Sequence, residues 1–136
     1  MSEALVHDAK TAEVAGFRVR RALPRRGIRT VGAWCFADHM GPELVTETSG
    51  LDVGPHPHIG LQTVTWLMEG AVLHTDSLGS EQLIRPGQLN LMTAGRGIVH
   101  AEESVRAHST SGSSTATMHG VQLWIAQPSA TRDGAS

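Results

Sequence analysis

Cysteine is almost absent from this sequence, since Cys35 is the single thiol in 136 residues. One thiol cannot form a disulfide within the chain, so the composition excludes a small fold held by disulfides and is compatible with a reducing compartment. The first residues also lack a basic segment followed by a long apolar run, and no stretch is long and apolar enough to span a bilayer. We therefore expect no signal peptide and no membrane contact, and the default location is the cytoplasm.

A strong charge of one sign is missing as well. The formal net charge is −2 and the isoelectric point is near 6.4, so no overall field attracts nucleic acid or an anionic membrane. Six arginines do cluster between Arg18 and Arg29. Because no aromatic residues are interleaved with them, we favour a solvated strand face and loop over an anionic partner, and we expect no direct contact with nucleic acid.

Long segments with the 3.6-residue apolar period of a helix are also absent. Instead, 15 glycines and 6 prolines separate short apolar runs, which favours an all-β domain with many turns. The length suits a single domain. Strands are expected at residues 17–23, 31–37, 62–68, 71–76, 82–84, 88–92, 98–102 and 121–125.

The two ends of the chain have weaker patterns than its middle. Residues 1–15 are polar, and we expect a poorly ordered lead-in there, while residues 127–136 should form a loose tail. The domain should cover residues 16–126, with a turn at residues 38–42. Residues 108–117 are rich in serine and threonine and indicate a surface linker.

Two pairs of potential metal ligands stand out, His56 with His58 and His100 with Glu102. One residue separates the members of each pair, and side chains two positions apart on a strand point to the same side. Two such strands facing each other would bring three imidazoles and one carboxylate to one point, inside a small β-barrel. In the alternative interpretation the histidines are turn or core residues and Glu102 is merely exposed.

Imidazole and carboxylate ligands suit borderline divalent metals. Four of them leave two positions of a six-coordinate ion open, where a redox-active ion such as iron can hold a substrate oxygen and a second small ligand. Fe(II) is the expected ion, with Mn, Ni, Cu, Co or Zn as alternatives. A structural zinc site is disfavoured because Cys35 lies far from both pairs. His39, in a predicted turn, and His74, alone on its predicted strand, are not included among the ligands.

The two pairs belong to a longer pattern that resembles the cupin superfamily, in which a glycine precedes His-x-His and a glycine-containing turn precedes a later histidine. The resemblance to the pirin family is closer still and covers about residues 16–124. It rests on residues 20–24 (RRALP), 36–42 (FADHMGP), 56–60 (HPHIG), 63–70 (TVTWLMEG) and 92–102 (MTAGRGIVHAE). The last of these segments is the most specific.

The resemblance implies a cupin-type β-barrel, that is, a double-stranded β-helix or jelly roll, with one iron ion. The ligand positions of the family fall on His56, His58, His100 and Glu102. Some pirins oxidise the flavonol quercetin with dioxygen and open its ring, and Glu102 would then be the natural base for the hydroxyl proton. Other pirins are transcriptional coregulators in the nucleus.

Three hypotheses follow from the resemblance. The first is an iron-dependent quercetin 2,3-dioxygenase with a flavonol-like substrate. The alternative is a metal-binding cupin without turnover that acts through a protein partner, as a transcription coregulator does. A sugar-isomerase-type cupin is the third and is disfavoured by the specific pirin segments.

The sequence departs from the pirin pattern in two respects. Pirins usually carry glutamate where this chain has Gln62, and counting along a strand places Gln62 on the same face as His58, near the metal. A neutral amide there makes activity less certain while metal binding should survive. Pirins also usually have two cupin domains, and the second is absent here. We therefore expect an exposed apolar patch that a homodimer, or a missing second domain, covers.

Overall fold

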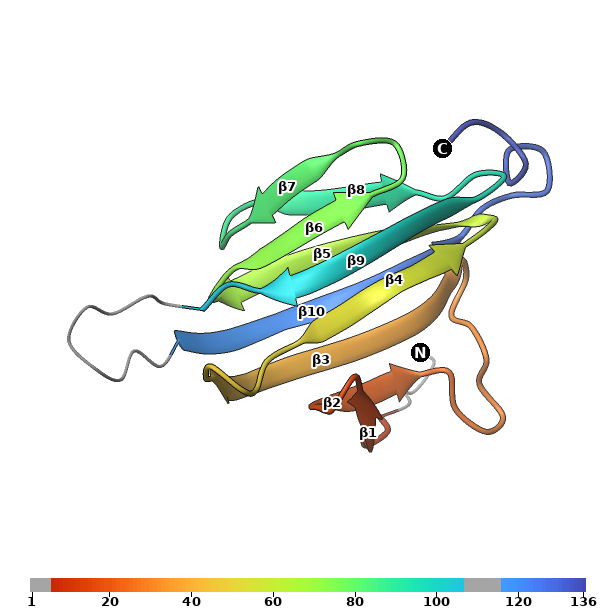
Figure 1. Cartoon of the computed structure of the whole chain (residues 1–136). Helices are drawn as coiled ribbons and strands as arrows, with labels where there is room; N and C mark the ends of the chain where they lie inside the picture. The colour runs from red at the N-terminus through yellow and green to blue at the C-terminus, as the bar shows by residue number, and fades with distance from the viewer. Residues whose placement is uncertain (1–5, 107–115) are drawn as a thin grey trace.

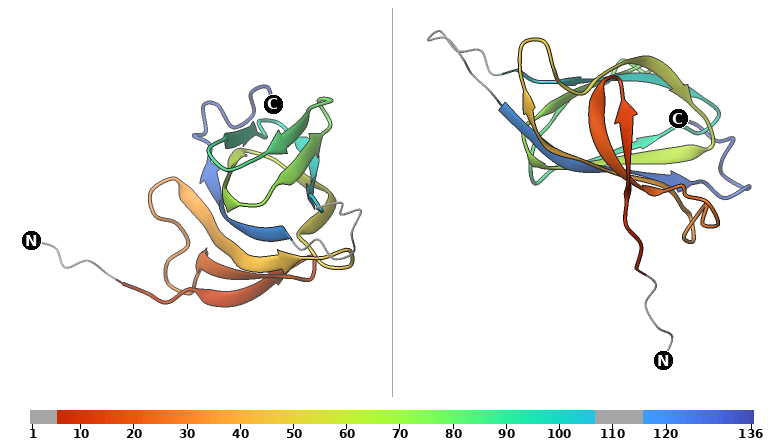
Figure 2. Two further views of the ribbon diagram at one scale, coloured as in Figure 1. Left: turned by 90° about the vertical axis from the view of Figure 1, so that its left-hand side faces the viewer. Right: turned by 90° about the horizontal axis from the view of Figure 1, so that it is seen from below.

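The computed structural model describes residues 6–106 and 116–136, and it confirms the all-β prediction. Two antiparallel sheets, of strand order β1-β2-β3-β10-β5-β8 and β4-β9-β6-β7, face each other and curve around a common interior (Figure 1 and Figure 2). The strands are β1 (Lys10–Val14), β2 (Phe17–Leu23), β3 (Trp34–Val45), β4 (Asp52–His58), β5 (Leu61–Glu69), β6 (Val72–Asp76), β7 (Glu81–Ile84), β8 (Leu89–Thr93), β9 (Ile98–Ser104) and β10 (Ala116–Ala126). The described residues contain no helix that is long and apolar enough to cross a membrane.

Alternation of side chains decides what each strand contributes to the interior. On β5, Thr63, Thr65 and Leu67 are buried while Trp66 and Met68 are exposed. This is the pattern of a strand with one face toward a core and the other toward solvent.

The interior contains polar side chains between two apolar clusters. The larger cluster includes Met40, Leu67 and Met118, and the smaller one consists of Met92, Ala94 and Ile98. Along β9 the buried positions run from Ile98, in the small cluster, through His100 and Glu102 to Ser104, whose hydroxyl hydrogen bonds with Leu51 in the large cluster. Buried polar groups are costly unless they have partners, so this stretch is where a functional centre is expected.

The strand that carries two of the predicted ligands, β4, is an edge strand, as its prolines predicted. It pairs with β9 alone, and the register shifts between Val53 and His56. Pro55 and Pro57 have no N–H to donate, and an edge strand tolerates this because one of its sides has no neighbour.

Three predictions about the course of the chain are wrong. Lys10–Val14 is not a poorly ordered lead-in but pairs with β2 through a hairpin whose turn is Ala15-Gly16, both with positive φ. Residues 127–136 are not a loose tail, because they hydrogen bond with the loop after β8: the Arg96 N–H donates to the Gly134 carbonyl (3.0 Å) and the Ser136 hydroxyl to the Ala94 carbonyl (2.8 Å). These contacts join segments far apart in sequence, and local patterns do not reveal them.

Residues 38–42 do not turn but lie within β3, which is 12 residues long. The pairing of β2 with β3 ends at Met40, so Pro42 lies where one side of β3 has no hydrogen-bonded neighbour. The segment predicted as a linker, residues 108–117, lies outside the described residues except for Ala116 and Thr117, which begin β10.

Candidate metal centre

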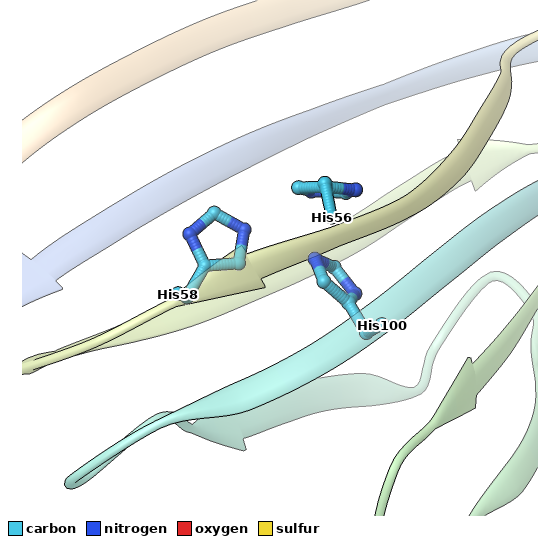
Figure 3. Close-up of side chains that lie close together, drawn as sticks. All are labelled: His56, His58 and His100. Carbon is cyan, nitrogen blue, oxygen red and sulfur yellow. The ribbon is translucent and has the colours of Figure 1, made fainter.

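The imidazoles of His56, His58 and His100 converge in the interior from two adjacent strands (Figure 3). His56 pairs with His100 in the β4–β9 register, and His58 follows two residues later on the same face. The ring centroids of His56 and His100 are 4.4 Å apart, and each lies 4.9 Å from that of His58. One nitrogen from each ring lies within 4.8 Å of the other two. The structure therefore brings three of the four predicted ligands together.

The donor atoms of these rings are suited to a metal. The Nδ1 atom of His56 lies 2.9 Å from the Gly54 carbonyl oxygen, which can only accept, so Nδ1 carries the proton and Nε2 keeps its lone pair. His100 is 2% exposed, and its buried Nε2 has no hydrogen-bond partner among the described residues. A buried polar atom without a partner needs an explanation, and a bound ion is one.

Both buried imidazoles stay neutral near pH 7. Burial lowers the pKa of His100 to about 3, and the neighbouring histidines add to this effect. Burial, followed by the proximity of His56, also lowers the pKa of His58. Because the neutral form of imidazole is the form that binds metals, these shifts favour coordination.

Glu102, the fourth predicted ligand, lies beside His100 but outside the three-histidine group. Its two carboxylate oxygens accept from the Gln122 amide at 2.9 and 2.8 Å, and one also accepts from the Thr65 hydroxyl at 3.3 Å. Its oxygens lie within 4.8 Å of nitrogens of His74 and His100, but form no such group with His56. Ligand atoms that share one ion at about 2.1 Å are at most about 4.2 Å apart.

Sequence reasoning missed the part that His74 plays. His74 is buried on β6, and its Nδ1 lies 3.3 Å from Nδ1 of His100. Its Nε2 lies 3.3 Å from a carboxylate oxygen of Asp76. The sequence did contain a signal, because His74-Thr75-Asp76 is a third pair of potential ligands separated by one residue, and it was overlooked.

The predicted position of Gln62 is wrong. Its side-chain amide donates to the Thr93 hydroxyl (2.9 Å), on the face of β5 opposite to buried Thr63 and Thr65. The prediction counted along one strand from His58. The chain instead turns through Gly60, whose φ is +67°, and β5 begins anew at Leu61, so the alternation does not carry over.

An aromatic wall adjoins the histidines, and the sequence did not predict it. The Trp124 ring lies edge-on to His58, with centroids 4.8 Å apart, and stacks on Phe36 at 4.1 Å. The Arg21 guanidinium lies 4.5 Å from the centroid of the Phe36 ring and is held by two hydrogen bonds to Asp38 (2.8 and 2.7 Å). The buried Nε1 of Trp124 has no hydrogen-bond partner among the described residues. The wall thus combines flat apolar surface with a donor and a cation.

Comparison with known proteins decides the family. The pirin family model matches residues 16–125. The chain belongs to the pirin family. As a pirin-family chain, it is 53% identical over 126 residues to a Pseudomonas aeruginosa protein whose name assigns it provisionally to the quercetin 2,3-dioxygenases, with 92% of this chain and 38% of the relative covered.

Solved pirin-type structures share the fold. A quercetin 2,3-dioxygenase of Acinetobacter baumannii is 53% identical with a TM-score of 0.83, over 93% of this chain and 40% of that one. A bacterial pirin of Escherichia coli, solved in complex with nickel(II), is 23% identical with a TM-score of 0.72, over 93% of this chain and 51% of that one. The cupin fold is therefore shown, and the chain spans about two fifths of the length of the relatives at 53% identity.

Proposed function

We propose that this pirin-family chain binds one divalent metal ion and acts as an oxidoreductase of the quercetin 2,3-dioxygenase type. The observation that carries the proposal is the buried, neutral, unpartnered Nε2 of His100 next to His56 and His58. The names of two relatives at 53% identity support the reaction type. Fe(II) is the proposed ion, with Mn, Ni, Cu, Co or Zn as alternatives, since nitrogen and oxygen ligands accept all of these.

His56, His58 and His100 would hold the ion, and Glu102 would be the fourth ligand. For this, the Glu102 carboxylate would turn from Gln122 toward the imidazoles. When bound, iron supplies exchange of electrons with dioxygen and Lewis acidity toward a substrate oxygen. Every other part of the reaction depends on how the protein binds and orients the substrate.

The aromatic wall fits a flat flavonol-like substrate. A planar ring system can lie against Trp124 and Phe36, since aromatic pairs gain energy beyond the area they bury. The Trp124 N–H is a ready donor for a substrate oxygen, and the Arg21 cation favours an anionic form of the substrate. The ionised carboxylate of Glu102 would take the proton of the substrate hydroxyl. Gln62, on the far face of β5, provides no argument against turnover.

The test is the loss of quercetin absorbance in air by protein loaded with Fe(II). The wild type should bleach quercetin, and His56→Ala should not because it removes one ligand. His119→Ala is the matched control, since His119 belongs to neither group of potential ligands. Bleaching by the wild type no faster than by His56→Ala would reject the proposed activity.

The alternative function, a metal-binding module that works through a protein partner, is favoured by one exposed apolar surface. We define the β5–β8 outer face as Trp66, Met68, Leu89 and Leu91, whose exposed fractions are 40–62%. Trp66 pairs with Leu89 in the β5–β8 register, so the four side chains share one side of the sheet. Apolar side chains gathered in this way commonly mark interaction sites.

We propose that a second copy of the chain covers this face. Size-exclusion chromatography with light scattering should give a dimer, and Leu89→Lys should shift it toward monomer. Val6→Lys, at an exposed apolar position outside the face, is the matched control. A wild type that stays monomeric at high concentration would contradict the dimer.

A further inference from the structure

A continuous chain of hydrogen bonds leads from the candidate metal centre to Asp76. Nδ1 of His100 lies 3.3 Å from Nδ1 of His74, and Nε2 of His74 lies 3.3 Å from Oδ2 of Asp76. The other oxygen of Asp76 accepts the backbone N–H groups of Leu78 (2.9 Å) and Ser80 (3.1 Å). The side chains of His74 and Asp76 are only 4% and 6% exposed, so little water competes for these bonds.

The donors and acceptors along this chain can be assigned from its far end. An ionised carboxylate can only accept, so Nε2 of His74 carries the proton that bonds to Asp76. In neutral His74 the other nitrogen, Nδ1, is then an acceptor. Nδ1 of His100 must therefore carry the proton between the two rings, which leaves the lone pair of His100 on Nε2. This is the buried atom that has no partner among the described residues.

We propose that His74 and Asp76 are positioning residues, which hold His100 in the orientation and tautomer that present its Nε2 to the metal. This inference rests on the metal centre proposed above. A histidine that binds a metal almost always donates its other N–H to a fixed acceptor, and losing such an acceptor typically lowers metal affinity 10–100-fold. In this chain the acceptor is a second imidazole, itself oriented by a carboxylate.

The pairing of the strands explains why these residues meet. In the β6–β9 register His74 is opposite Glu102 and Asp76 is opposite His100, so the three buried rings and carboxylates alternate across adjacent strands. The turn after β6 then fixes Asp76 through its backbone bonds to Leu78 and Ser80. His74 and Asp76 also border a pocket of about 410 Å³, so the far end of the chain lies next to a space outside the metal centre.

A competing assignment makes His74 a metal ligand, because His74, His100 and Glu102 also form a group of potential ligands. In that arrangement Nδ1 of both rings would have to bind the ion, and His100 would bridge two ions as a doubly deprotonated ring. The contact between His74 and Asp76 would be left unexplained. The two assignments predict different numbers of bound ions, one per chain for positioning and two for ligation.

The decisive variant is Asp76→Asn, which keeps the shape of the side chain. The amide oxygen must face the N–H groups of Leu78 and Ser80, so the amide NH₂ faces His74 and donates to it. This reverses every bond of the chain: His74 then donates from Nδ1, and His100 must accept at Nδ1 and carry its proton on Nε2. His74→Phe is the second variant and removes the chain altogether. Asp52→Asn, at a surface ion pair with Arg106, is the matched control.

Two measurements test the proposal. The first records ¹H–¹⁵N correlations of the imidazoles in metal-free protein, where His100 should be protonated at Nδ1 in the wild type and at Nε2 in Asp76→Asn. The second measures Co²⁺ affinity by chelator competition together with the number of ions bound. Asp76→Asn and His74→Phe should bind one Co²⁺ about 10–100-fold more weakly than the wild type, and Asp52→Asn as tightly as the wild type.

Three results would overturn the proposal. One is an unchanged tautomer of His100 in Asp76→Asn, and another is unchanged Co²⁺ affinity in both variants. The third is a second Co²⁺ in the wild type that His74→Phe loses, because His74 would then be a ligand. If the wild type bound no Co²⁺ at all, the proposed metal centre would fail, and with it the positioning role. The tautomer measurement would still show whether the hydrogen-bond chain exists, so the two failures are distinguishable.

Discussion

Acid should destabilise the metal-free chain, and His100 should account for a large share of the effect. Burial lowers the pKa of His100 to about 3 in the folded chain, whereas an unfolded histidine has a pKa of about 6.5. Between these two values the unfolded state binds a proton that the folded state does not, so a falling pH favours unfolding. The stability provided by neutral His100 is complete above pH 6.5 and decreases as the pH falls toward 3.

The size of the effect follows from the width of this window. Each pH unit between the two pKa values changes the free energy of unfolding by about 1.4 kcal/mol. Lowering the pH from 6.5 to 4 should therefore cost about 3 kcal/mol through His100. Since small domains are stable by about 5–15 kcal/mol, this loss is large enough to measure.

The assay is urea unfolding of metal-free protein at pH 7, 6, 5 and 4, compared between the wild type and His100→Gln. Glutamine does not titrate and can still donate to His74, so the variant should lose about 3 kcal/mol less than the wild type over this range. His7→Gln, at an exposed position, is the matched control and should follow the wild type. Parallel pH profiles for the wild type and His100→Gln would refute the reasoning.

Three further substitutions test other contacts. Glu102→Gln removes the proposed base and should slow quercetin loss by at least about 100-fold while Co²⁺ still binds; an unchanged rate would exclude that role. Ser104→Ala leaves the buried Leu51 N–H, now bonded to the hydroxyl at 2.8 Å, without that partner, and should lower the free energy of unfolding by about 1–3 kcal/mol in urea titrations, so no loss would contradict its importance. Gly41→Ala should lower the melting temperature strongly, because φ is +70° there and a Cβ would meet the Met118 carbonyl oxygen; a wild-type melting temperature would contradict the tight approach.

The parts of the site that depend on spacing along one strand could be predicted from the sequence. His56 and His58 share a face of β4, and His100 and Glu102 share a face of β9, because alternation is a property of any strand. The edge position of β4 also followed from its prolines. In each case the deciding information lies within a few residues.

The parts that depend on pairing between strands could not be predicted in the same way. Glu102 turns toward Gln122 on β10, a strand from the opposite sheet, and His74 reaches His100 through the β6–β9 register. Gln62 was misplaced because a single glycine turn resets the alternation. The sequence records which residues can meet, whereas partner and register depend on long-range packing.

The edge position of β4 has a consequence for the order in which this chain opens. Two of the three convergent histidines lie on a strand that is anchored on one side only and has two prolines, while the third lies on the neighbouring β9. An ion shared by these strands would act as a clasp that fastens the weakest margin of the barrel to its interior. Fraying of that margin and release of the ion would then be one event, so the metal content of the chain would report on the integrity of the sheet.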